Sequence, residues 1–362
     1  FEFGDIVCNF IYFSLAEMNH LIMVFWFGRD RTCFIALFKT TDAVHESFSS
    51  RNRPVTCTGF FIALVWSPVT SHVRSHVWRI DGRIFIIMKC SDAALFSDLD
   101  GTLFNCRGEV SINNRNAIED FIAQGGMFGI ATGRASQNAL QHLPGISINA
   151  PSIVFNGAAV YDYVNKRYIL ANYLDAESLP LIKELAECGK RLDIQLYTEY
   201  GIFYVTPEKR SYKPFVDMHR PCTFCKVDDI ADRPWLKTLF LGAEEDLDYA
   251  RELIAKRGLE DKFDIVPGTT DILPDAKYIE LLPHGTNKGS GVEALRTLSS
   301  LSGRSIICVG DYWNDLEMLQ RADVACVPLN GAEEVKALAH YITPDNNHDA
   351  IAYIIEKIIP GL

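Results

Sequence analysis

The stretch that decides the fold reads Phe96-Ser97-Asp98-Leu99-Asp100-Gly101-Thr102-Leu103. It continues an apolar run, 93–96, that is typical of a buried β-strand. Two carboxylates, those of Asp98 and Asp100, therefore stand where a strand ends and a Gly-Thr turn begins. Open α/β sheets bind their ligands at this carboxyl edge. Two acids so placed can share a cation, while one attacks as a nucleophile and the other moves a proton.

An isolated Asp-x-Asp pair is more often a surface turn, because Asp and Gly are common turn residues. Three further polar clusters favour the chemical interpretation, since each lies beside an apolar or helical pattern. Thr132-Gly133-Arg134 follows the apolar run 127–131, and Lys288 precedes a helical pattern at 290–298. The last cluster, Gly310-Asp311 with Asn314-Asp315, follows the apolar run 305–309.

These four clusters together resemble the motifs of the haloacid dehalogenase superfamily, and they occur in the order of that family. The resemblance covers about Met88 to Leu362. Two further segments, Phe155-Asn156-Gly157-Ala158 and Leu282-Pro283-His284-Gly285-Thr286-Asn287-Lys288-Gly289, are similar to those of the Cof-type phosphatases. That subgroup carries a large α/β cap domain between its second and third motifs.

The resemblance implies an α/β fold with a Rossmann-like parallel-sheet core and an inserted α/β cap domain. We expect the core at 88–171 and 275–362 and the cap at 172–274. Alternating strand and helix patterns independently favour a parallel sheet covered on both faces. The apolar segment 278–282 is expected to be the strand with which the core resumes.

The resemblance also implies roles for the acidic residues. Asp98 is expected to attack phosphorus and form an aspartyl-phosphate, with Asp100 protonating the leaving group and then activating water. Mg²⁺ is the expected cofactor, held by Asp98, the Asp100 carbonyl and Asp311, because oxygen ligands suit this ion. Asp315 is expected to orient Lys288 or a water bound to the metal.

The phosphate is expected to be bound by four residues from three of these motifs, namely Thr132, Gly133, Lys288 and Asn314. Taken singly, each motif has a plainer interpretation, such as a helix cap, a surface lysine or an acid pair at a helix amino terminus. Arg134 fits a structural role as well as a substrate-facing one, and Asn156 equally fits its turn.

The function expected is that of a Mg²⁺-dependent phosphatase of small phosphorylated metabolites, such as a sugar phosphate, a nucleotide or a cofactor phosphate. A sugar phosphomutase on the same scaffold is an alternative, and a non-catalytic regulator that binds phosphorylated metabolites is another. The aromatic residues of the cap pattern do not identify the substrate, and we expect them to pack the cap sheet: Tyr197, Tyr200, Phe203 and Tyr204.

Composition limits the partners that the chain can have. A net charge of −11 argues against a nucleic-acid binder held by a basic surface. No apolar stretch approaches the ~20 residues that a membrane span needs. Ten cysteines without a secreted spacing pattern indicate a reducing cytoplasm. Cys222 and Cys225 could form a zinc half-site or redox pair, but ordinary thiols are expected.

Residues 1–87 show neither a persistent helical or strand period nor any match to the family. We expect this region to be an amino-terminal extension outside the functional domain, with an artefact of gene prediction as one explanation. A packed extension is the alternative. The sequence does not indicate an oligomeric state.

Overall fold

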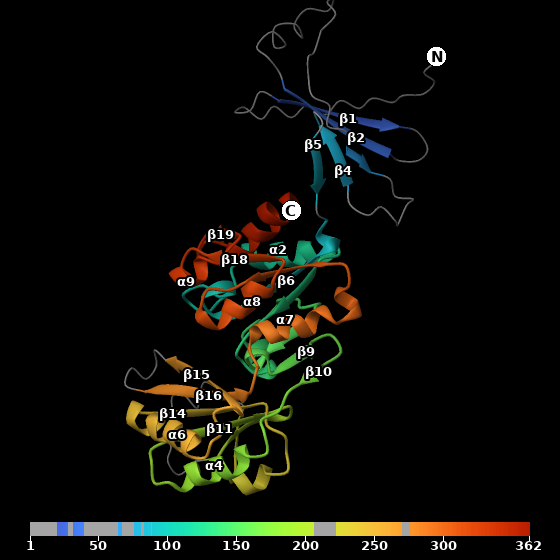
Figure 1. The fold of residues 1–362 in the computed structure, drawn as a ribbon. Coiled ribbons are helices and arrows are strands. Elements are labelled where there is room, and N and C mark those ends of the chain that lie inside the picture. Colours follow the sequence, from blue (N-terminus) through green and yellow to red (C-terminus); the bar gives the residue numbers. More distant parts are fainter. Residues whose placement is uncertain are drawn as a thin grey trace, which may run out of the picture. The chain divides into compact units, whose positions relative to one another are not determined.

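The computed structural model describes residues 89–205, 222–269 and 276–362, together with the backbone of the strands at 20–27, 32–39, 64–66, 76–80 and 83–87 (Figure 1). The chain divides into two compact units, Phe1–His76 and Val77–Leu362. All the motifs identified above lie in the second unit.

The core of the second unit is a five-stranded parallel sheet in the order β19-β18-β17-β6-β7. Its central strand pair is formed by β6 (Ala93–Ser97) and β17 (Ser305–Val309), as expected from their apolar sequences. The flanking strands are β7 (Met127–Ile130), β18 (Val324–Pro328) and β19 (Tyr341–Thr343). The predicted parallel-sheet α/β core is therefore confirmed.

Helices cover both faces of this sheet because successive strand residues point to opposite sides. Leu95 of β6 packs with α2 (Ile112–Ala123) and the carboxy-terminal helical segment that begins with α10 (Ala350–Tyr353). Its neighbour Phe96 packs with α7 (Lys288–Arg296) and α8 (Leu316–Arg321) on the other side. The helices α3 (Ser136–Gln141) and α9 (Glu333–Lys336) complete the two layers.

A small antiparallel sheet, β10-β9-β8, continues from the core. It consists of β8 (Ser152–Val154), β9 (Ala159–Asp162) and β10 (Arg167–Ala171), and a single bridge joins Ile153 to Ala131. A turn at residues 163–166 joins β9 to β10.

The cap sheet has six strands in the order β13-β12-β11-β14-β16-β15. The strands are β11 (Asp193–Thr198), β12 (Gly201–Tyr204), β13 (Cys222–Phe224), β14 (Lys237–Gly242), β15 (Phe263–Thr269) and β16 (Lys277–Pro283). The expectation that 278–282 is a core strand is therefore wrong. It pairs antiparallel with β14 and β15, and sheet membership depends on distant partners that a local apolar pattern does not reveal.

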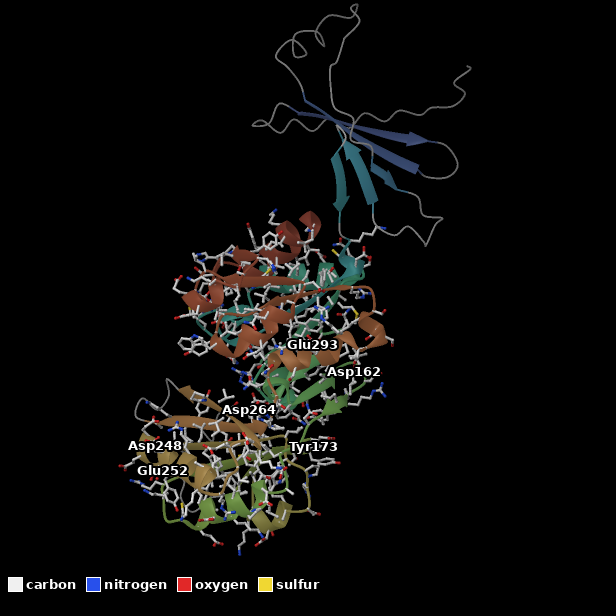
Figure 2. All side chains as sticks on the ribbon, in the orientation of Figure 1. Asp162, Tyr173, Asp248, Glu252, Asp264 and Glu293 are labelled. Atoms are coloured by element: carbon white, nitrogen blue, oxygen red, sulfur yellow. The ribbon has the colours of Figure 1, made fainter. Side chains whose placement is uncertain are left out.

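The two faces of the cap sheet have different neighbours. One face packs on α4 (Ser178–Glu187) and α6 (Glu244–Lys256), whose outer surfaces carry exposed acids such as Asp248 and Glu252 (Figure 2). The other face places Tyr197, Leu239 and Leu282 against Phe155 and other apolar residues of the core motif segments. The cap sheet is thus packed directly beside the loops that carry the candidate site.

In the first unit, the strands β1 (His20–Phe27), β2 (Thr32–Lys39) and β3 (Leu64–Trp66) form an antiparallel sheet. A separate pair, β4 (His76–Ile80) and β5 (Arg83–Ile87), lies in the second unit except for His76. The remaining residues of 1–87 lie outside those described, so the expectation about this extension stays a prediction. None of the helices in the described part of the chain combines the length and hydropathy that a bilayer crossing requires.

Candidate active site

The register of the parallel sheet brings three of the polar clusters to one edge. Ser97 is paired with Val309 on one side and with Ile130 on the other. The next residues along the three strands therefore include Asp98, Asp311 and Thr132. The N–H of Asp98 donates to the Val309 carbonyl over 2.9 Å, which fixes the backbone of this acid at the sheet edge.

Lys288 reaches the same edge from the first turn of α7. Asn287 caps that helix, since its side chain accepts a hydrogen bond from the Ser290 N–H and the Ser290 hydroxyl accepts one from the Asn287 N–H. Gly157 lies so close that an added Cβ would stand 2.0 Å from the Asn287 carbonyl oxygen, so only glycine fits this approach. The Asn-Gly turn predicted at 156–157 thus helps to seat Lys288.

Lys288 Nζ donates to both Asp98 Oδ1 and Asp315 Oδ1, each over 2.7 Å. The Lys288 side chain is completely buried, and those of Asp98 and Asp315 are 10% and 0% exposed. The plainer interpretation of Lys288 as a surface lysine is therefore wrong. A buried lysine with two carboxylate partners is a fixed positive charge at the end of the sheet.

Burial and neighbouring charge act on these groups in opposite directions. Burial raises the pKa of Asp98 well above its ordinary value, and the charge of Lys288 opposes that shift. For Lys288, burial disfavours the charged form, but the charges of Asp315 and Asp98 outweigh it and raise its pKa. Burial also raises the pKa of Asp311 to about 6, against the effect of a hydrogen bond from Thr102.

The carboxylates of Asp98, Asp311 and Asp315 form a group in which one oxygen atom of each lies within 4.8 Å of the others. With Lys288 as their cation, the ionised group retains two negative charges more than positive ones. Buried charge of this sign favours a divalent cation, and an all-oxygen donor set is what Mg²⁺ prefers. The residues therefore fit the expected metal.

Within this group, Asp315 is occupied by protein donors. Its Oδ1 accepts from Lys288, and its Oδ2 accepts from the N–H groups of Asp311 (3.0 Å) and Tyr312 (3.1 Å). Asp311 Oδ1 accepts from the Thr102 hydroxyl over 2.8 Å. This arrangement favours Asp98 and Asp311 as metal ligands and Asp315 as the residue that orients Lys288 and the Asp311 loop.

Asp100 lies in the turn after Asp98 but outside the buried group. Its carboxylate is 62% exposed and accepts two hydrogen bonds from Arg134, Nε to Oδ2 over 3.0 Å and Nη2 to Oδ1 over 2.7 Å. The Arg134 guanidinium also lies over the ring of Phe104, 5.5 Å from its centre. Both residues therefore stand at the mouth of the site, and Arg134 has a definite acidic partner.

Thr132 is buried, and its hydroxyl oxygen accepts a hydrogen bond from the Arg134 N–H over 3.1 Å. The hydroxyl proton is then available to a further acceptor. Asn156 adopts a left-handed backbone (φ 52°), which Asn tolerates better than most residues, and its N–H donates to the Thr132 carbonyl over 3.0 Å. Asn314 Nδ2 donates to Asn156 Oδ1 over 3.3 Å. Asn156 thus links two of the phosphate-binding candidates, Thr132 and Asn314, in one network.

Sequence reasoning missed a buried ion pair beside this network. Lys237 of β14 and Glu280 of β16 are joined over 2.5 Å, with side chains 4% and 9% exposed. Neither residue belongs to a motif. The available signal was a single charge in each of two otherwise apolar strand segments, 236–241 and 279–282.

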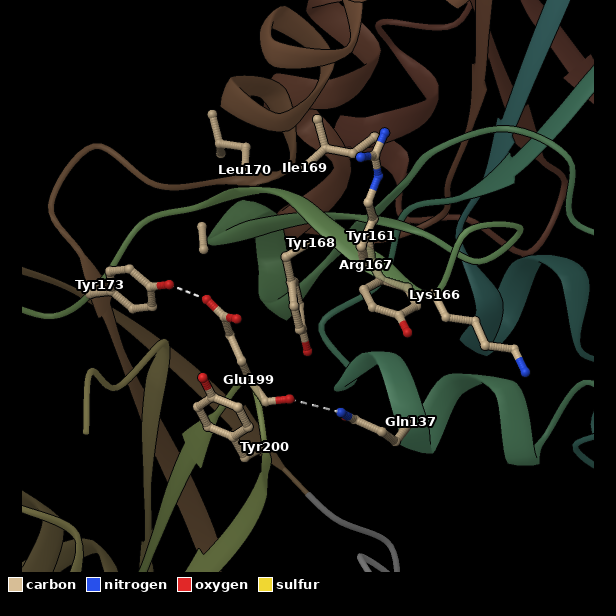
Figure 3. Close-up of a pocket in the computed structure, with 11 residues that line it drawn as sticks. Gln137, Tyr161, Lys166, Arg167, Tyr168, Ile169, Leu170, Tyr173, Glu199 and Tyr200 are labelled. Carbon is tan, nitrogen blue, oxygen red and sulfur yellow. Dashed lines mark hydrogen bonds between the residues drawn. The ribbon is translucent and has the colours of Figure 1, made fainter.

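A hollow about 580 Å³ in volume lies beside the β9–β10 hairpin rather than at the acidic group (Figure 3). Its lining includes Tyr173, whose hydroxyl donates to the Glu199 carboxylate, and Gln137, whose Nε2 donates to the Glu199 carbonyl over 3.1 Å. Tyr200 lines it too and is 75% exposed, so the expectation that this tyrosine packs in the cap sheet is wrong. The other three aromatics of that set are buried as expected: Tyr197, Phe203 and Tyr204.

Cys222 and Cys225 are not joined by a disulfide in the structure. Burial raises the pKa of the Cys225 thiol, which disfavours a reactive thiolate. Their expected role as ordinary thiols stays a prediction.

Comparison with known proteins places this geometry in context. Residues 95–355 match the family model described as haloacid dehalogenase-like hydrolase. The chain is 25% identical over 297 residues to 5-amino-6-(5-phospho-D-ribitylamino)uracil phosphatase YwtE of Bacillus subtilis, covering 76% of this chain and 99% of that protein. It is also similar in structure to a haloacid dehalogenase-like hydrolase of Bacteroides thetaiotaomicron, with a TM-score of 0.62 and 25% identity over 74% of this chain and 99% of the other.

A further relative is longer than this chain. The chloroplastic endoribonuclease YBEY of Arabidopsis thaliana is 27% identical over 301 residues, which make up 77% of this chain but 48% of that protein. The chain therefore spans about half the length of that relative.

Proposed function

The chain belongs to the haloacid dehalogenase-like hydrolase family, and we propose that this phosphoric monoester hydrolase acts on small phosphorylated metabolites through an aspartyl-phosphate at Asp98, with Mg²⁺ as its cofactor. The observation that carries the proposal is the pair of 2.7 Å hydrogen bonds from Lys288 Nζ to Asp98 and Asp315. In a solvated surface turn, Asp98 would not be paired with a buried lysine.

Asp98 suits the nucleophile because its backbone is fixed by β17 and one oxygen is bound by Lys288. A carboxylate is repelled by a phosphate dianion, and the Lys288 charge beside it offsets part of that repulsion. Mg²⁺, held by Asp98, the Asp100 carbonyl and Asp311, would supply Lewis-acid neutralisation of phosphoryl charge when bound.

Phosphoryl transfer depends mostly on positioning and electrostatic stabilisation. Thr132 offers a buried hydroxyl whose acceptor side is already satisfied, so it is suited to donate to a phosphoryl oxygen. The Gly133 N–H, Lys288 and Asn314 are the further donors that we propose. Together these groups match the three equatorial oxygens on which charge develops.

Asp100 is proposed as the acid for the leaving group and the base for the attacking water. It follows Asp98 by two residues, and Arg134 holds its carboxylate at the mouth of the site. We propose that an alcohol leaving group departs on this side of the site.

The substrate is proposed to lie between the core edge and the cap sheet. In this arrangement, the core supplies the catalytic residues and the cap determines which leaving groups are accepted. A division into core, 88–171 with the segment after Pro283, and cap, 172–283, agrees with the pairing of β16. The substrate named for the B. subtilis relative is one candidate class, a phosphorylated ribityl compound.

The test is a panel of phosphate esters assayed with Mg²⁺ for release of inorganic phosphate. The panel contains sugar phosphates, nucleotides, cofactor phosphates and 5-amino-6-(5-phospho-D-ribitylamino)uracil, and Asp98→Asn is the control because it removes the nucleophile at almost constant volume. We expect turnover by the parent and a loss of at least about 1,000-fold in the variant. Turnover of the variant within tenfold of the parent would overturn the role of Asp98, and an isomeric phosphate ester as product would indicate a mutase.

A further inference from the structure

Lys237 and Glu280 bring opposite charges from the cap sheet to the candidate phosphate site. They lie on neighbouring antiparallel strands, where Leu239 is paired with Glu280 and Thr238 with Leu281. Lys237 Nζ and Glu280 Oε1 are 2.5 Å apart, and the Lys237 ammonium also lies 4.7 Å from the centre of the Tyr197 ring. The pair is buried where this face of the cap sheet packs on the core.

Lys237 also contacts the loop after β7. Its Nζ donates to the Gly133 carbonyl over 3.0 Å. That carbonyl belongs to the same peptide unit as the Arg134 N–H, which donates to the Thr132 hydroxyl oxygen over 3.1 Å. Because a peptide unit is planar, fixing its carbonyl also fixes the direction of its N–H. Lys237 thereby determines where the Thr132 hydroxyl oxygen is held.

Glu280, the other member of the pair, contacts Asn156. The carboxylate accepts from Asn156 Nδ2 over 2.8 Å. A carboxylate accepts but does not donate, so the Asn156 amide must turn its nitrogen toward Glu280 and its oxygen away. Asn156 Oδ1 then accepts from Asn314 Nδ2 over 3.3 Å. Glu280 thereby determines where the Asn314 amide is held.

We propose that Lys237 and Glu280 are positioning residues that set the Thr132 hydroxyl and the Asn314 amide for phosphate binding. Neither touches the reacting atoms, since Lys237 acts through the peptide that joins Gly133 to Arg134 and Glu280 acts through Asn156. This inference rests on the proposed phosphatase function.

Stability alone does not account for such a pair. Exchanging a buried ion pair for apolar side chains of similar volume is often neutral or stabilising. A charged pair, in contrast, gives directional hydrogen bonds that an apolar pair lacks. Here one hydrogen bond joins the two charges, and the other two lead to the Gly133 carbonyl and the Asn156 amide, each one step from a phosphate-binding candidate.

The test compares two double variants with the parent enzyme. Lys237→Met with Glu280→Gln removes the Gly133 contact but leaves an acceptor for Asn156, whereas Lys237→Met with Glu280→Leu removes both. Both exchanges eliminate the charges together, so neither leaves one charge buried alone. The readouts are the dissociation constant of inorganic phosphate with Mg²⁺ present, kcat and KM for an aryl phosphate, and the thermal midpoint.

We expect phosphate affinity and kcat to fall by about tenfold in the first double variant and by about 100-fold in the second, because small misplacements of binding groups have effects of this size. The thermal midpoint should change far less than in Leu253→Ala, a core truncation in the cap that has no contact with the site. If these double variants do not fold, Lys237→Gln with Glu280→Gln, which is also neutral and keeps a donor beside position 280 but is too short for Gly133, is expected to show the first loss.

Gln137→Ala is the matched control for a loosened cap. Gln137 makes a different hydrogen bond between core and cap, from its Nε2 to the Glu199 carbonyl (Figure 3), and this bond does not pass through Gly133 or Asn156. Parent-like phosphate affinity in this control supports positioning by the ion pair. Equal losses in Gln137→Ala and the double variants overturn it in favour of a general effect of cap attachment.

Two outcomes separate this inference from the proposed function. If the parent binds and releases phosphate and the double variants do so equally well, the positioning role is wrong while the phosphatase function stands. If the parent neither hydrolyses any ester nor binds inorganic phosphate, the proposed function fails and the inference fails with it.

Discussion

Arg134 binds the carboxylate of Asp100 through two nearly parallel hydrogen bonds, Nε to Oδ2 over 3.0 Å and Nη2 to Oδ1 over 2.7 Å. Asp100, which we propose moves protons, is therefore bound by a residue that does not belong to the buried acidic group. The guanidinium of Arg134 stays protonated, and its paired hydrogen bonds fix the direction of the Asp100 carboxylate. A carboxyl group needs such a fixed direction to reach a leaving group.

Replacing Arg134 with Ala should slow the hydrolysis of alkyl phosphates more than that of aryl phosphates. An alkoxide leaving group needs a proton from a correctly placed Asp100, whereas a phenolate leaves without one. We expect the ratio of alkyl to aryl kcat to fall by about tenfold or more. Steady-state assays of one ester of each kind give the result, and Arg134→Lys, which keeps the charge without the paired bonds, is the control. Equal losses on both esters would instead assign Arg134 to phosphate binding.

Asp100→Asn should accumulate a phosphorylated enzyme when given an aryl phosphate. The first step proceeds because the leaving group needs no acid, but the second lacks the base that activates water. Intact-mass measurement of quenched reactions should show one added phosphoryl group, and it should be missing from a variant that also carries Asp98→Asn. Steady turnover without any adduct contradicts the double role of Asp100.

The acidic site was predictable from sequence because its residues stand at the ends of apolar runs. Register along a parallel sheet then brings Asp98, Asp311 and Thr132 to one edge, whatever the loops between them contain. The helical pattern at 290–298 likewise predicted that Lys288 stands at the start of a helix. Local patterns of this kind carry most of the core fold.

Residues whose partners come from distant strands were not predictable in the same way. The segment 278–282 has the composition of any buried strand, and only its pairing with 238–242 assigns it to the cap sheet. The ion pair of Lys237 and Glu280 was unpredictable for the same reason, since the two charges are brought together only by the pairing of β14 with β16. The contact of Arg134 with Asp100 also joins two separate loops.

Mg²⁺ binding should weaken as the pH falls through about 6, because burial raises the pKa of Asp311 to that value in the metal-free protein. A ligating carboxyl must be deprotonated, so protonation of Asp311 below this point should lower the apparent affinity by about tenfold per pH unit, and the raised pKa of Asp98 should add to the loss. In the metal-free protein, the contribution of Asp311 to stability has the opposite pH dependence to that of metal affinity. The folded state holds this proton to higher pH than the unfolded state, so this group lowers the free energy of unfolding as the pH rises from about 4 to about 6.

Calorimetric titration of Mg²⁺ at several pH values measures the midpoint, with Thr102→Val as the matched variant. The Thr102 hydroxyl donates to Asp311 Oδ1 and lowers its pKa, so its removal should move the midpoint to higher pH. A midpoint that stays in place in Thr102→Val, or an affinity that does not depend on pH, contradicts the role of Asp311 as a ligand.

A chain that begins at Met88 should hydrolyse phosphate esters as fast as the full chain. Every proposed catalytic, phosphate-binding and metal-binding residue follows it, and the family match itself begins at residue 95. The matched variant begins at Val77, the first residue of the second compact unit, and so retains β5. Turnover number and thermal midpoint are compared for the three chains. If the chain from Val77 is active while that from Met88 misfolds or loses most of its activity, the strand pair belongs to the enzyme and its boundary lies near 77. If both short chains fail, the extension 1–76 is itself required.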